Sequence, residues 1–269
     1  MNRMNVTIDP RASVSPKAVL GSNVTIGPFT IVEDDVLIGD GTTIAANALI
    51  ANGARLGKEC RIHHGAVISN VPQDLKYAGE RTTCELGDRN IVREYAVFHR
   101  GTGEGGRTVA GNDNFFMAYT HLAHDCVIGN NVIMANASML AGHVTIEDYV
   151  IIGGLTPVHQ FVHVGRHSMV GGAVRVSKDV PPFILAGNEP LVFEGLNHIG
   201  LRRRGFAKES MEALHRAYTV LYRSHLNVSQ ALARIQDDAV LMGCNEVRIL
   251  VEFVASSKRG IIPAPLLAS

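Results

Sequence analysis

Aliphatic residues recur at every sixth position along most of this chain. We call these residues rungs, and they form three series: Ile8, Val14, Leu20, Ile26, Val32, Ile38, Ile44, Ile50, Leu56, Ile62 and Ile68; Leu86, Val92 and Phe98; and Ala110, Phe116, Leu122, Ile128, Met134, Leu140, Ile146, Ile152, Val158, Val164, Val170 and Val176. A period of six fits neither an α-helix nor a long flat strand. It indicates a chain that runs straight for a few residues, turns, and runs straight again in repeated coils.

The residues around each rung predict short strands joined by tight corners. The fourth residue after a rung is usually small, as in Ala18 and Ser138, and lies two positions before the next rung, so both face inward. Glycine often follows the rung directly, as in Gly39, where we expect it to permit the corner. Three such strands close one triangular coil of 18 residues. This hexapeptide-repeat pattern predicts an all-β fold and resembles the left-handed parallel β-helix of acyltransferases, which supplies the handedness.

Two interruptions in the series predict loops. Continuing past Ile68 would place Asp74 inside the coil, where an unpaired carboxylate costs several kcal/mol. We therefore predict an extruded loop at about 69–84. A second, glycine-rich loop is predicted at about 100–108, as a flexible linker or a functional lid.

The C-terminal part has a different pattern. Hexads stop beyond Lys178, and from about Ala207 the apolar residues follow helical spacing. We predict a β-helix domain over 1–190 and a helical domain over 191–269. Such helices would cap the coil and pack on neighbouring subunits.

Composition excludes several classes of protein. The 25 basic and 25 acidic residues balance, which argues against nucleic acid as a partner. The first ten residues contain no apolar core of a signal peptide, and no stretch is long enough to be a transmembrane segment. We therefore expect a cytoplasmic protein, and its four cysteines, which form no CxxC, are expected to be reduced structural thiols.

Polar residues fall into columns when the 18-residue coil is applied. His124, Gly142 and Gln160 are 18 apart and should stack at one corner, with coils about 4.8 Å apart. Asp125 and His143 form the next column. His121 and His159 should point outward on the same side.

This group of residues suggests acyl transfer to a hydroxyl or an amine. A neutral histidine beside a carboxylate can accept a proton, with the partner fixing its tautomer. A glycine N–H one coil away can face a developing oxyanion, because no side chain obstructs it. His124, Asp125 and Gly142 are the candidates for these roles.

Seven segments carry a resemblance to a known family over nearly the whole chain. They are QDLKYAGE (73–80), GDRN (87–90), FHRGT (98–102), HLAHDC (121–126), LAGH (140–143), VHQF (158–161) and LRRRGF (201–206). They resemble the acyl-[acyl-carrier-protein]–UDP-N-acetylglucosamine O-acyltransferase family, whose members begin lipid A synthesis. The loop, the HLAHDC segment and the RRGF segment together are specific to it.

The resemblance implies a homotrimer with active sites in the clefts between subunits. The donor would be a (R)-3-hydroxyacyl thioester on acyl carrier protein, and the acceptor the 3-position of UDP-N-acetylglucosamine. By matching motif, His124 is the general base, Asp125 orients it, and the Gly142 N–H stabilises the oxyanion. No metal or cofactor is expected, since a thioester is already activated.

The resemblance also assigns the substrate-binding residues. Those expected to line the cleft, contact the sugar or acyl group, or bind the nucleotide are Gln73, Asp74, Lys76, His121, His143, His159, Gln160, Asn197, Arg203 and Arg204. Gly172 is expected to set the depth of the acyl groove, admitting a chain of about fourteen carbons by the resemblance. Many members have glutamate where this chain has Ile199, so one nucleotide contact is missing, and the acceptor is either the hydroxyl sugar or a 3-amino analogue.

Three alternatives come from other classes. A γ-class carbonic anhydrase shares the left-handed helix and binds zinc through three histidines, but it would not need the 73–80 loop or the arginine run at 202–204. A sibling N-acyltransferase usually adds an N-terminal uridine-binding domain, for which hexads starting at Ile8 leave no room. A purely structural β-helix would leave the outward His124 and Asp125 unexplained.

Overall fold

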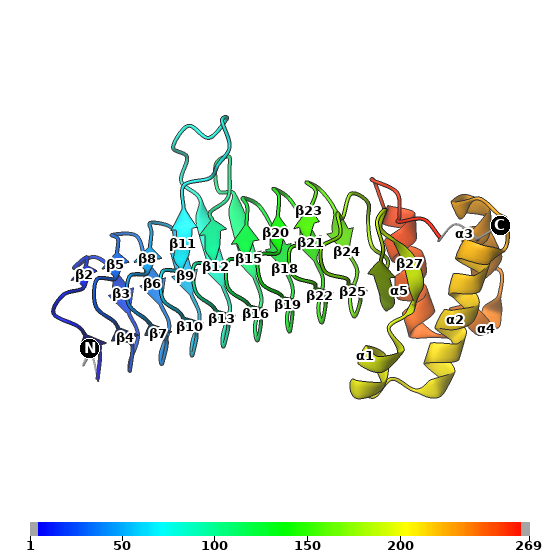
Figure 1. Ribbon diagram of the computed structural model, residues 1–269, viewed down its shortest axis with the longest axis horizontal. Coiled ribbons are helices and arrows are strands. Elements are labelled where there is room, and N and C mark those ends of the chain that lie inside the picture. The colour runs from blue at the N-terminus through cyan, green and yellow to red at the C-terminus, as the bar shows by residue number, and fades with distance from the viewer. Residues whose placement is uncertain (1–4, 265–269) are drawn as a thin grey trace.

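The computed structural model describes residues 5–264, which form a parallel β-helix with a group of helices at its C-terminal end (Figure 1). Three sheets make the sides of the triangular coil. Sheet A contains β1 (Thr7–Ile8), β4 (Thr25–Ile26), β7 (Thr43–Ile44), β10 (Arg61–Ile62), β13 (Ile91–Val92), β16 (Phe115–Phe116), β19 (Ile133–Met134), β22 (Ile151–Ile152), β25 (Met169–Val170), β26 (Ile184–Gly187) and β27 (Val192–Leu196). Sheet B contains β2 (Ser13–Val14), β5 (Ile31–Val32), β8 (Leu49–Ile50), β11 (Val67–Asn70), β14 (Val97–His99), β17 (His121–Leu122), β20 (Met139–Leu140) and β23 (Pro157–Val158). Sheet C contains β3 (Val19–Leu20), β6 (Leu37–Ile38), β9 (Ala54–Leu56), β12 (Thr83–Leu86), β15 (Arg107–Ala110), β18 (Val127–Ile128), β21 (Thr145–Ile146) and β24 (His163–Val164).

The strand register confirms the predicted 18-residue coil in the middle of the chain. In sheet B, Leu122 pairs with Leu140, and Leu140 pairs with Val158, all in parallel. These three rungs are buried inside the coil, with at most 2% of their surface exposed. The core is therefore a stack of aliphatic layers, and residues at the same corner of successive coils are neighbours.

Glycine directly after a rung has a different role at the corners from the one predicted. Gly39, directly after a rung, does not have a positive φ; instead, a β-carbon there would lie 2.5 Å from the carbonyl oxygen of Gly57 on the next coil. Glycine at this position permits close approach of two backbones. The left-handed conformation falls two residues later, at the third residue after the rung, as in Asp125 (φ 58°) and His143 (φ 59°).

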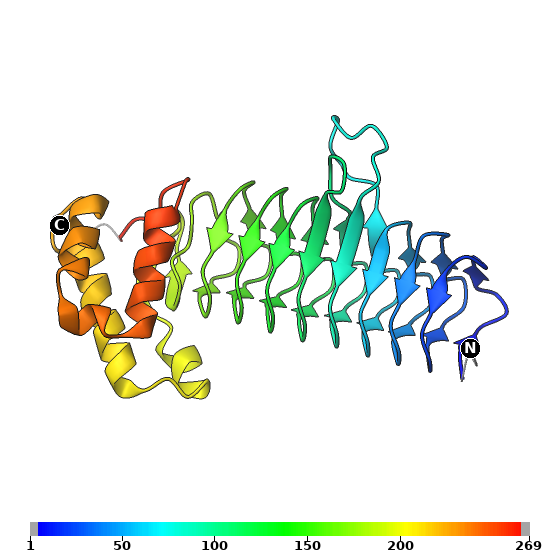
Figure 2. The same cartoon turned by 180° about the vertical axis from the view of Figure 1, so that it is seen from behind.

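Two loops leave the coil at neighbouring positions. Residues 71–82 connect β11 to β12, and residues 100–106 connect β14 to β15. Both project from the same edge of the solenoid, between sheets B and C, in both views (Figures 1 and 2). The strands on either side reach further than the expected loop bounds of 69–84 and 100–108, because β11 and β12 are four residues long and β15 begins at Arg107.

The helical segment begins at His198, seven residues after the predicted start at 191. The reason is that β27 pairs antiparallel with β26 and so extends sheet A to Leu196. Five helices follow: α1 (His198–Arg203), α2 (Lys208–Arg223), α3 (Val228–Gln236), α4 (Ala239–Met242) and α5 (Asn245–Ser256). None of the helices within residues 5–264 has the length and apolar character needed to cross a bilayer.

Hydrogen bonds connect the helices to the end of the coil. The buried carboxylate of Asp179 accepts the hydroxyl of Ser257 at 2.6 Å and the backbone N–H of His163 at 2.8 Å. The hydroxyl of the buried Tyr218, on α2, donates to the carbonyl of Pro182 at 2.5 Å. The helices therefore cover the last coil and close the apolar core.

Candidate active site

His124 lies at the corner between sheets B and C, two residues after its rung. Its ring is outside the coil but is not open to solvent, since only 6% of the residue is exposed. Nδ1 lies 2.9 Å from Oδ2 of Asp125. Because a carboxylate is an acceptor, this contact places the proton of the neutral ring on Nδ1 and leaves Nε2 free to accept one.

Asp125 is held by several donors at once. Its Oδ2 accepts the hydroxyl of Thr102 at 2.5 Å as well as His124 Nδ1, and the Thr102 N–H reaches Oδ1 at 3.1 Å. Its own N–H donates to the Thr108 hydroxyl at 2.9 Å. Burial acts to raise the pKa of Asp125, but the hydrogen bonds from Thr102 and His124 outweigh burial and hold that pKa below its ordinary value. Asp125 is therefore a charged, fixed acceptor.

Gly142 lies one coil beyond His124 and directly against its ring. A β-carbon at Gly142 would lie 2.5 Å from Cε1 and 2.6 Å from Nε2 of His124. Among residues 5–264, no protein group accepts a hydrogen bond from the Gly142 N–H, whereas the next N–H, of His143, donates to the carbonyl of His124 at 3.0 Å. The structure thus brings a free backbone donor beside the candidate base.

Two more histidines extend the site along sheet B. His121 packs edge-on against His99, with ring centroids 5.1 Å apart, and His99 Nδ1 lies 2.6 Å from the carbonyl of Val71 at the root of the loop. Burial, with a smaller contribution from His99, lowers the pKa of His121 to about 4. His121 is therefore neutral at neutral pH and suited to hydrogen bonding with uncharged groups.

The remaining predicted cleft residues lie on the next two coils. His143 stacks flat on Phe161, with centroids 4.8 Å apart, and its Nε2 lies 3.8 Å from Asp125 Oδ2. His159 and Gln160 are exposed, and His159 Nδ1 lies 3.1 Å from the carbonyl of Gln160. These side chains line the same corner and face solvent in the single chain.

The extruded loop brings a second carboxylate to the base. Asp74 Oδ2 lies 3.7 Å from His124 Nε2, on the side opposite Asp125. Gln73 and Lys76 are exposed on the same loop. Arg100 holds the loop in place, because its guanidinium donates to the hydroxyl of Tyr77 at 3.0 Å and to the backbone carbonyl of Asn52 at 3.0 Å.

A metal ion is the alternative use of these groups. His124, Asp125 and His143 bring one ligand atom each to within 4.8 Å of one another. Their contacts favour proton transfer instead, since Asp125 Oδ2 already accepts from Thr102 and from His124. The group also has two histidines, where the zinc site of a γ-class carbonic anhydrase uses three.

Gly172 lies at a different corner from His124. It follows β25 in sheet A, whereas His124 follows β17 in sheet B. A β-carbon at Gly172 would lie 3.1 Å from the carbonyl oxygen of Gly154 and meet no side chain within 4 Å. Within one chain the two residues do not share a cleft.

The residues expected at the nucleotide gather near α1. A cavity of about 480 Å³ is lined mainly by apolar side chains and includes Asn197, Ile199 and Arg203. Asn197 is itself buried and caps α1, accepting the N–H of Gly200 at 3.1 Å and donating to the carbonyl of His167 at 2.9 Å. Part of its hydrogen-bonding capacity therefore maintains the fold.

Arg204 differs from its neighbour Arg203. Arg203 is exposed, whereas Arg204 is half-buried, donates to the carbonyl of Tyr149 at 3.1 Å and lies over that ring. Burial lowers the pKa of Arg204 from its ordinary value. Its Nη1 is buried and has no hydrogen-bond partner among the described residues.

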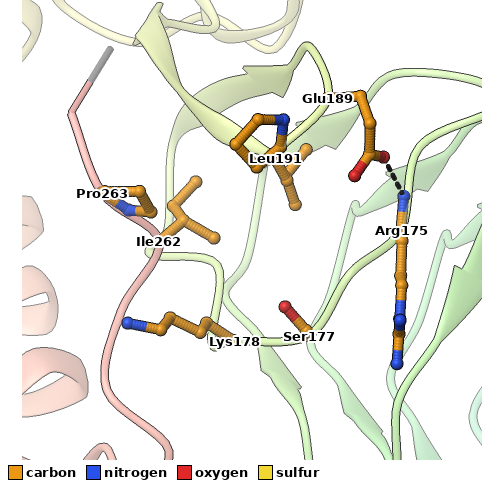
Figure 3. A pocket seen from close by; sticks show the side chains of 8 residues that line it. Arg175, Ser177, Lys178, Glu189, Leu191, Ile262 and Pro263 are labelled. Carbon is orange, nitrogen blue, oxygen red and sulfur yellow. Dashed lines mark hydrogen bonds between the residues drawn. The ribbon is translucent and has the colours of Figure 1, made fainter. Parts of the chain in front are cut away.

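Another cavity, of about 450 Å³, lies at the end of the coil (Figure 3). Lys178 lies on its wall. The cavity is otherwise bounded by Arg175, Glu189 and the chain at Ile262, three coils beyond the base, and it contains none of the candidate catalytic groups. It is separate from the site described above.

Three residues of the site were absent from the sequence-based assignment. The hydroxyls of Thr102 and Thr108 both hydrogen-bond to Asp125. His99 contacts the carbonyl of Val71, where the extruded loop begins. The sequence did draw attention to His99 and Thr102, because both belong to the FHRGT segment at 98–102, which contributes to the family resemblance. Spacing could not find Thr102, since it lies on a loop outside the 18-residue repeat.

Family models match two parts of the chain. A model described as UDP N-acetylglucosamine O-acyltransferase, domain 2, matches residues 179–262. A model described as bacterial transferase hexapeptide (six repeats) matches residues 35–70. The first covers the end of the coil and the helices, and the second covers early coils.

Relatives that match over most of the chain agree with both models. An acyl-[acyl-carrier-protein]–UDP-N-acetylglucosamine O-acyltransferase of Burkholderia orbicola is 45% identical over 202 residues, 74% of this chain and 77% of that protein. One of Thiobacillus denitrificans is 46% identical over 200 residues, 74% of this chain and 77% of that protein. The crystal structure of a UDP-N-acetylglucosamine acyltransferase from Bacteroides fragilis matches with a TM-score of 0.92 and 45% identity, covering 94% of this chain and 99% of that chain. The expected left-handed parallel β-helix with C-terminal helices is thereby confirmed.

Proposed function

The chain belongs to the acyl-[acyl-carrier-protein]–UDP-N-acetylglucosamine O-acyltransferase family, and from this premise we propose that it transfers a (R)-3-hydroxyacyl group from acyl carrier protein to the 3-position of UDP-N-acetylglucosamine. This reaction is the first step of lipid A biosynthesis. One observation carries the proposal beyond the family. It is the arrangement in which Asp125 fixes Nδ1 of His124 while Nε2 lies beside both Asp74 and the free Gly142 N–H.

The chemistry follows from this arrangement. His124 Nε2 removes the proton from the acceptor hydroxyl as its oxygen attacks the thioester carbonyl. The oxyanion of the tetrahedral intermediate accepts a hydrogen bond from the Gly142 N–H. When the intermediate collapses, the C–S bond breaks, and the departing thiolate of the carrier takes the proton from the His124 imidazolium. Asp125 stabilises that imidazolium through Nδ1–H.

The predicted binding residues receive roles consistent with their positions. Asp74 is placed to orient the acceptor hydroxyl, since it faces the nitrogen that removes the proton. The side chains proposed to complete the sugar and acyl pocket are Gln73, Lys76, His121, His143, His159 and Gln160. Asn197, Arg203 and Arg204 are proposed to bind the nucleotide, since guanidinium groups match phosphate oxygens and Nη1 of Arg204 has no hydrogen-bond partner within residues 5–264.

We propose a homotrimer in which each site lies between two subunits. Support comes from the corner between sheets A and B, where four exposed apolar or aromatic side chains lie three residues after a rung: Phe29, Tyr95, Tyr119 and Leu155. Tyr95 and Tyr119 lie on adjacent coils and stack with ring centroids 5.4 Å apart. Exposed aromatic and apolar side chains gathered along one corner of an isolated chain indicate a contact surface. Gly172 lies at this same corner, so pairing it with the His124 corner of a neighbour would bring Gly172 of one subunit toward the His124 of the next. Because the proposed donor and acceptor are both cytoplasmic molecules, we propose that the enzyme acts there.

The test is a direct transfer assay with the purified protein. It uses (R)-3-hydroxyacyl carrier proteins of several chain lengths, with UDP-N-acetylglucosamine and its 3-amino analogue as acceptors. We expect transfer to one of these sugars that persists after treatment with a chelator. Absence of transfer to both acceptors at every chain length would refute the proposed reaction.

A further inference from the structure

The loop at 100–106 carries a side chain that the reaction scheme has not yet used. Thr102 lies 23 residues before Asp125, and its hydroxyl donates to Asp125 Oδ2 at 2.5 Å. Its backbone N–H lies 3.1 Å from Oδ1 and 3.2 Å from Oδ2. One residue therefore supplies two donors to both oxygens of the carboxylate that holds the base.

The loop around Thr102 is tightly closed, which fixes these donors in space. A β-carbon at Gly101 would lie 2.2 Å from the carbonyl carbon of Gly106, and one at Gly106 would lie 1.9 Å from the carbonyl oxygen of Thr102. The Gly101 N–H donates to the carbonyl of Thr83 at 3.1 Å, which ties the loop to the coil. Glycine at positions 101 and 106 is needed for close packing of the chain on itself, so the base of this loop is compact.

Asp125 needs such donors because of where it lies. Its side chain is only 14% exposed, and a carboxylate removed from water is costly unless it is hydrogen-bonded. Its Oδ2 must also be aimed at His124 Nδ1, because a rotation of the carboxylate would release the ring and its tautomer. The Thr102 hydroxyl and N–H hold both oxygens in the orientation that does this.

We propose that Thr102 is a positioning residue for acyl transfer, which keeps the Asp125 carboxylate charged and directed at His124 so that Nε2 remains the proton acceptor. This inference rests on the proposed function. Thr102 acts through Asp125 and His124 and touches neither substrate. The three residues form a chain of hydrogen bonds from the loop to the base.

The proposal has a pH signature. The titratable groups that face Asp125 are His124 beside it and His143 on the next coil, at 3.8 Å, while the loop contributes only the neutral Thr102. The Thr102 hydrogen bonds help to hold the pKa of Asp125 low. Removing the hydroxyl raises that pKa, so the acidic limb of the rate profile moves to higher pH.

The test compares three variants of the full-length enzyme. Thr102→Val removes the hydroxyl but keeps the branched shape and the backbone N–H, Thr102→Ser keeps the hydroxyl, and Thr120→Val is the matched control. Thr120 is buried on the same coil as His124, and its hydroxyl has no hydrogen-bond partner among the described residues. Steady-state kcat and KM for both substrates are measured across pH, with circular dichroism and thermal unfolding to verify the fold.

We expect T102V to lower kcat about ten- to a hundredfold, the range for losing a hydrogen bond to a charged group, with both KM values nearly unchanged. The acidic limb should move upward in T102V, while T102S restores most of the turnover and T120V behaves as wild type. Normal kcat and an unshifted profile in T102V would overturn the proposal. If T102V does not fold, a folded T102S with a tenfold loss would overturn it as well. An inactive wild type would instead count against the proposed function.

Discussion

The ring of His124 occupies the space that a side chain at position 142 would need. A β-carbon on Gly142 would lie 2.5 Å from Cε1 of His124, closer than any normal contact between these atoms. Glycine at position 142 therefore does two things. It leaves an N–H that no group among the described residues accepts, and it allows the His124 ring to lie directly against the next coil.

Gly142→Ala separates these two effects, because alanine keeps the N–H. The φ of Gly142 is not positive, so the backbone accepts alanine, and the imidazole must move instead. We expect kcat to fall by about a hundredfold, the usual cost of misplacing a catalytic group by an ångström. Gly243→Ala, at the end of α4 and far from the site, is the control. An active G142A enzyme would mean that His124 tolerates displacement.

Removing the base is the more severe change. His124→Ala should lower kcat by about a hundred- to ten-thousandfold, the usual contribution of a positioned general base. Asp125→Ala should lower kcat less, since it positions the base and does not transfer the proton. The fold should persist in both, as measured by circular dichroism and size-exclusion chromatography. A folded H124A enzyme with near-normal turnover would remove His124 from the mechanism.

The hexad pattern predicted more of the fold than any single residue could. The rungs determine which side chains enter the coil, and the register Leu122 to Leu140 to Val158 follows from their spacing. The column of His124 and Gly142 follows from the same arithmetic. These features were accessible because a solenoid turns long-range contacts into a short repeat in the sequence.

The contacts made by the two loops could not be predicted from the repeat. Asp74 reaches His124, and Thr102 reaches Asp125, from segments that leave the repeat, so no period relates their positions. Glycine directly after a rung was expected to permit the turn, but a sequence does not distinguish a positive φ from a close approach of two backbones. Gly39 requires the second.

Arg203, the last residue of α1, and Arg204, its C-cap, should behave differently. Arg203→Ala should raise the KM for the UDP-sugar by about tenfold with unchanged thermal stability, since Arg203 is exposed and lines the cavity near Ile199. Arg204→Ala should raise this KM and also lower the melting temperature, because Arg204 packs over Tyr149 and donates to its carbonyl. For each variant, the KM for the UDP-sugar and the melting temperature are measured on the same preparation. An unchanged KM in R203A would indicate that the Arg203 side chain is only a solvated surface charge and does not bind the nucleotide.

The junction between the coil and the helices should weaken in acid. Glu147 lies between Arg166, whose Nε is 3.0 Å from Oε2, and His163, whose Nε2 is 2.9 Å from Oε1. Burial acts to raise the pKa of Glu147, but the contacts with His163 and Arg166 outweigh it and lower the pKa to about 2. A depressed pKa contributes stability above the ordinary value of 4.5, and this is lost as the pH falls toward about 2.

The full shift in pKa corresponds to about 3 kcal/mol, and solvent screening of this partly exposed group of charges reduces the contribution to on the order of 1–2 kcal/mol. The melting temperature of the wild type should therefore fall as the pH is lowered from about 4.5 to about 2, the interval between the ordinary pKa of Glu147 and its lowered pKa. Glu147→Gln should be less stable at neutral pH and show a shallower acid dependence. Parallel slopes for the two proteins would show that Glu147 does not control the transition.

The last prediction concerns the length of the acyl chain and which subunit provides the residue that limits it. Gly172 puts no side chain into the groove, so Gly172→Met should shorten it and make the enzyme prefer a chain several carbons shorter. Each buried methylene contributes about 0.8 kcal/mol, so a few carbons amount to more than tenfold in relative kcat/KM. The nearest atom to a new β-carbon is the carbonyl oxygen of Gly154 at 3.1 Å, so the coil needs only a small shift to accept the substitution. An unchanged length profile in a folded G172M enzyme would make Gly172 a turn residue.

Mixed trimers then test the position of the groove, because His124 and Gly172 lie at different corners of one coil. A trimer of H124A subunits alone is inactive, and one of G172M subunits alone uses only short chains. If the base and the groove residue of one site come from different subunits, a mixed trimer contains sites with an intact His124 facing an unsubstituted Gly172. Long-chain transfer should then reappear in co-purified mixtures, although neither parent has it. If both residues served the same site from one chain, every active site would carry the methionine, and mixing would restore no long-chain activity.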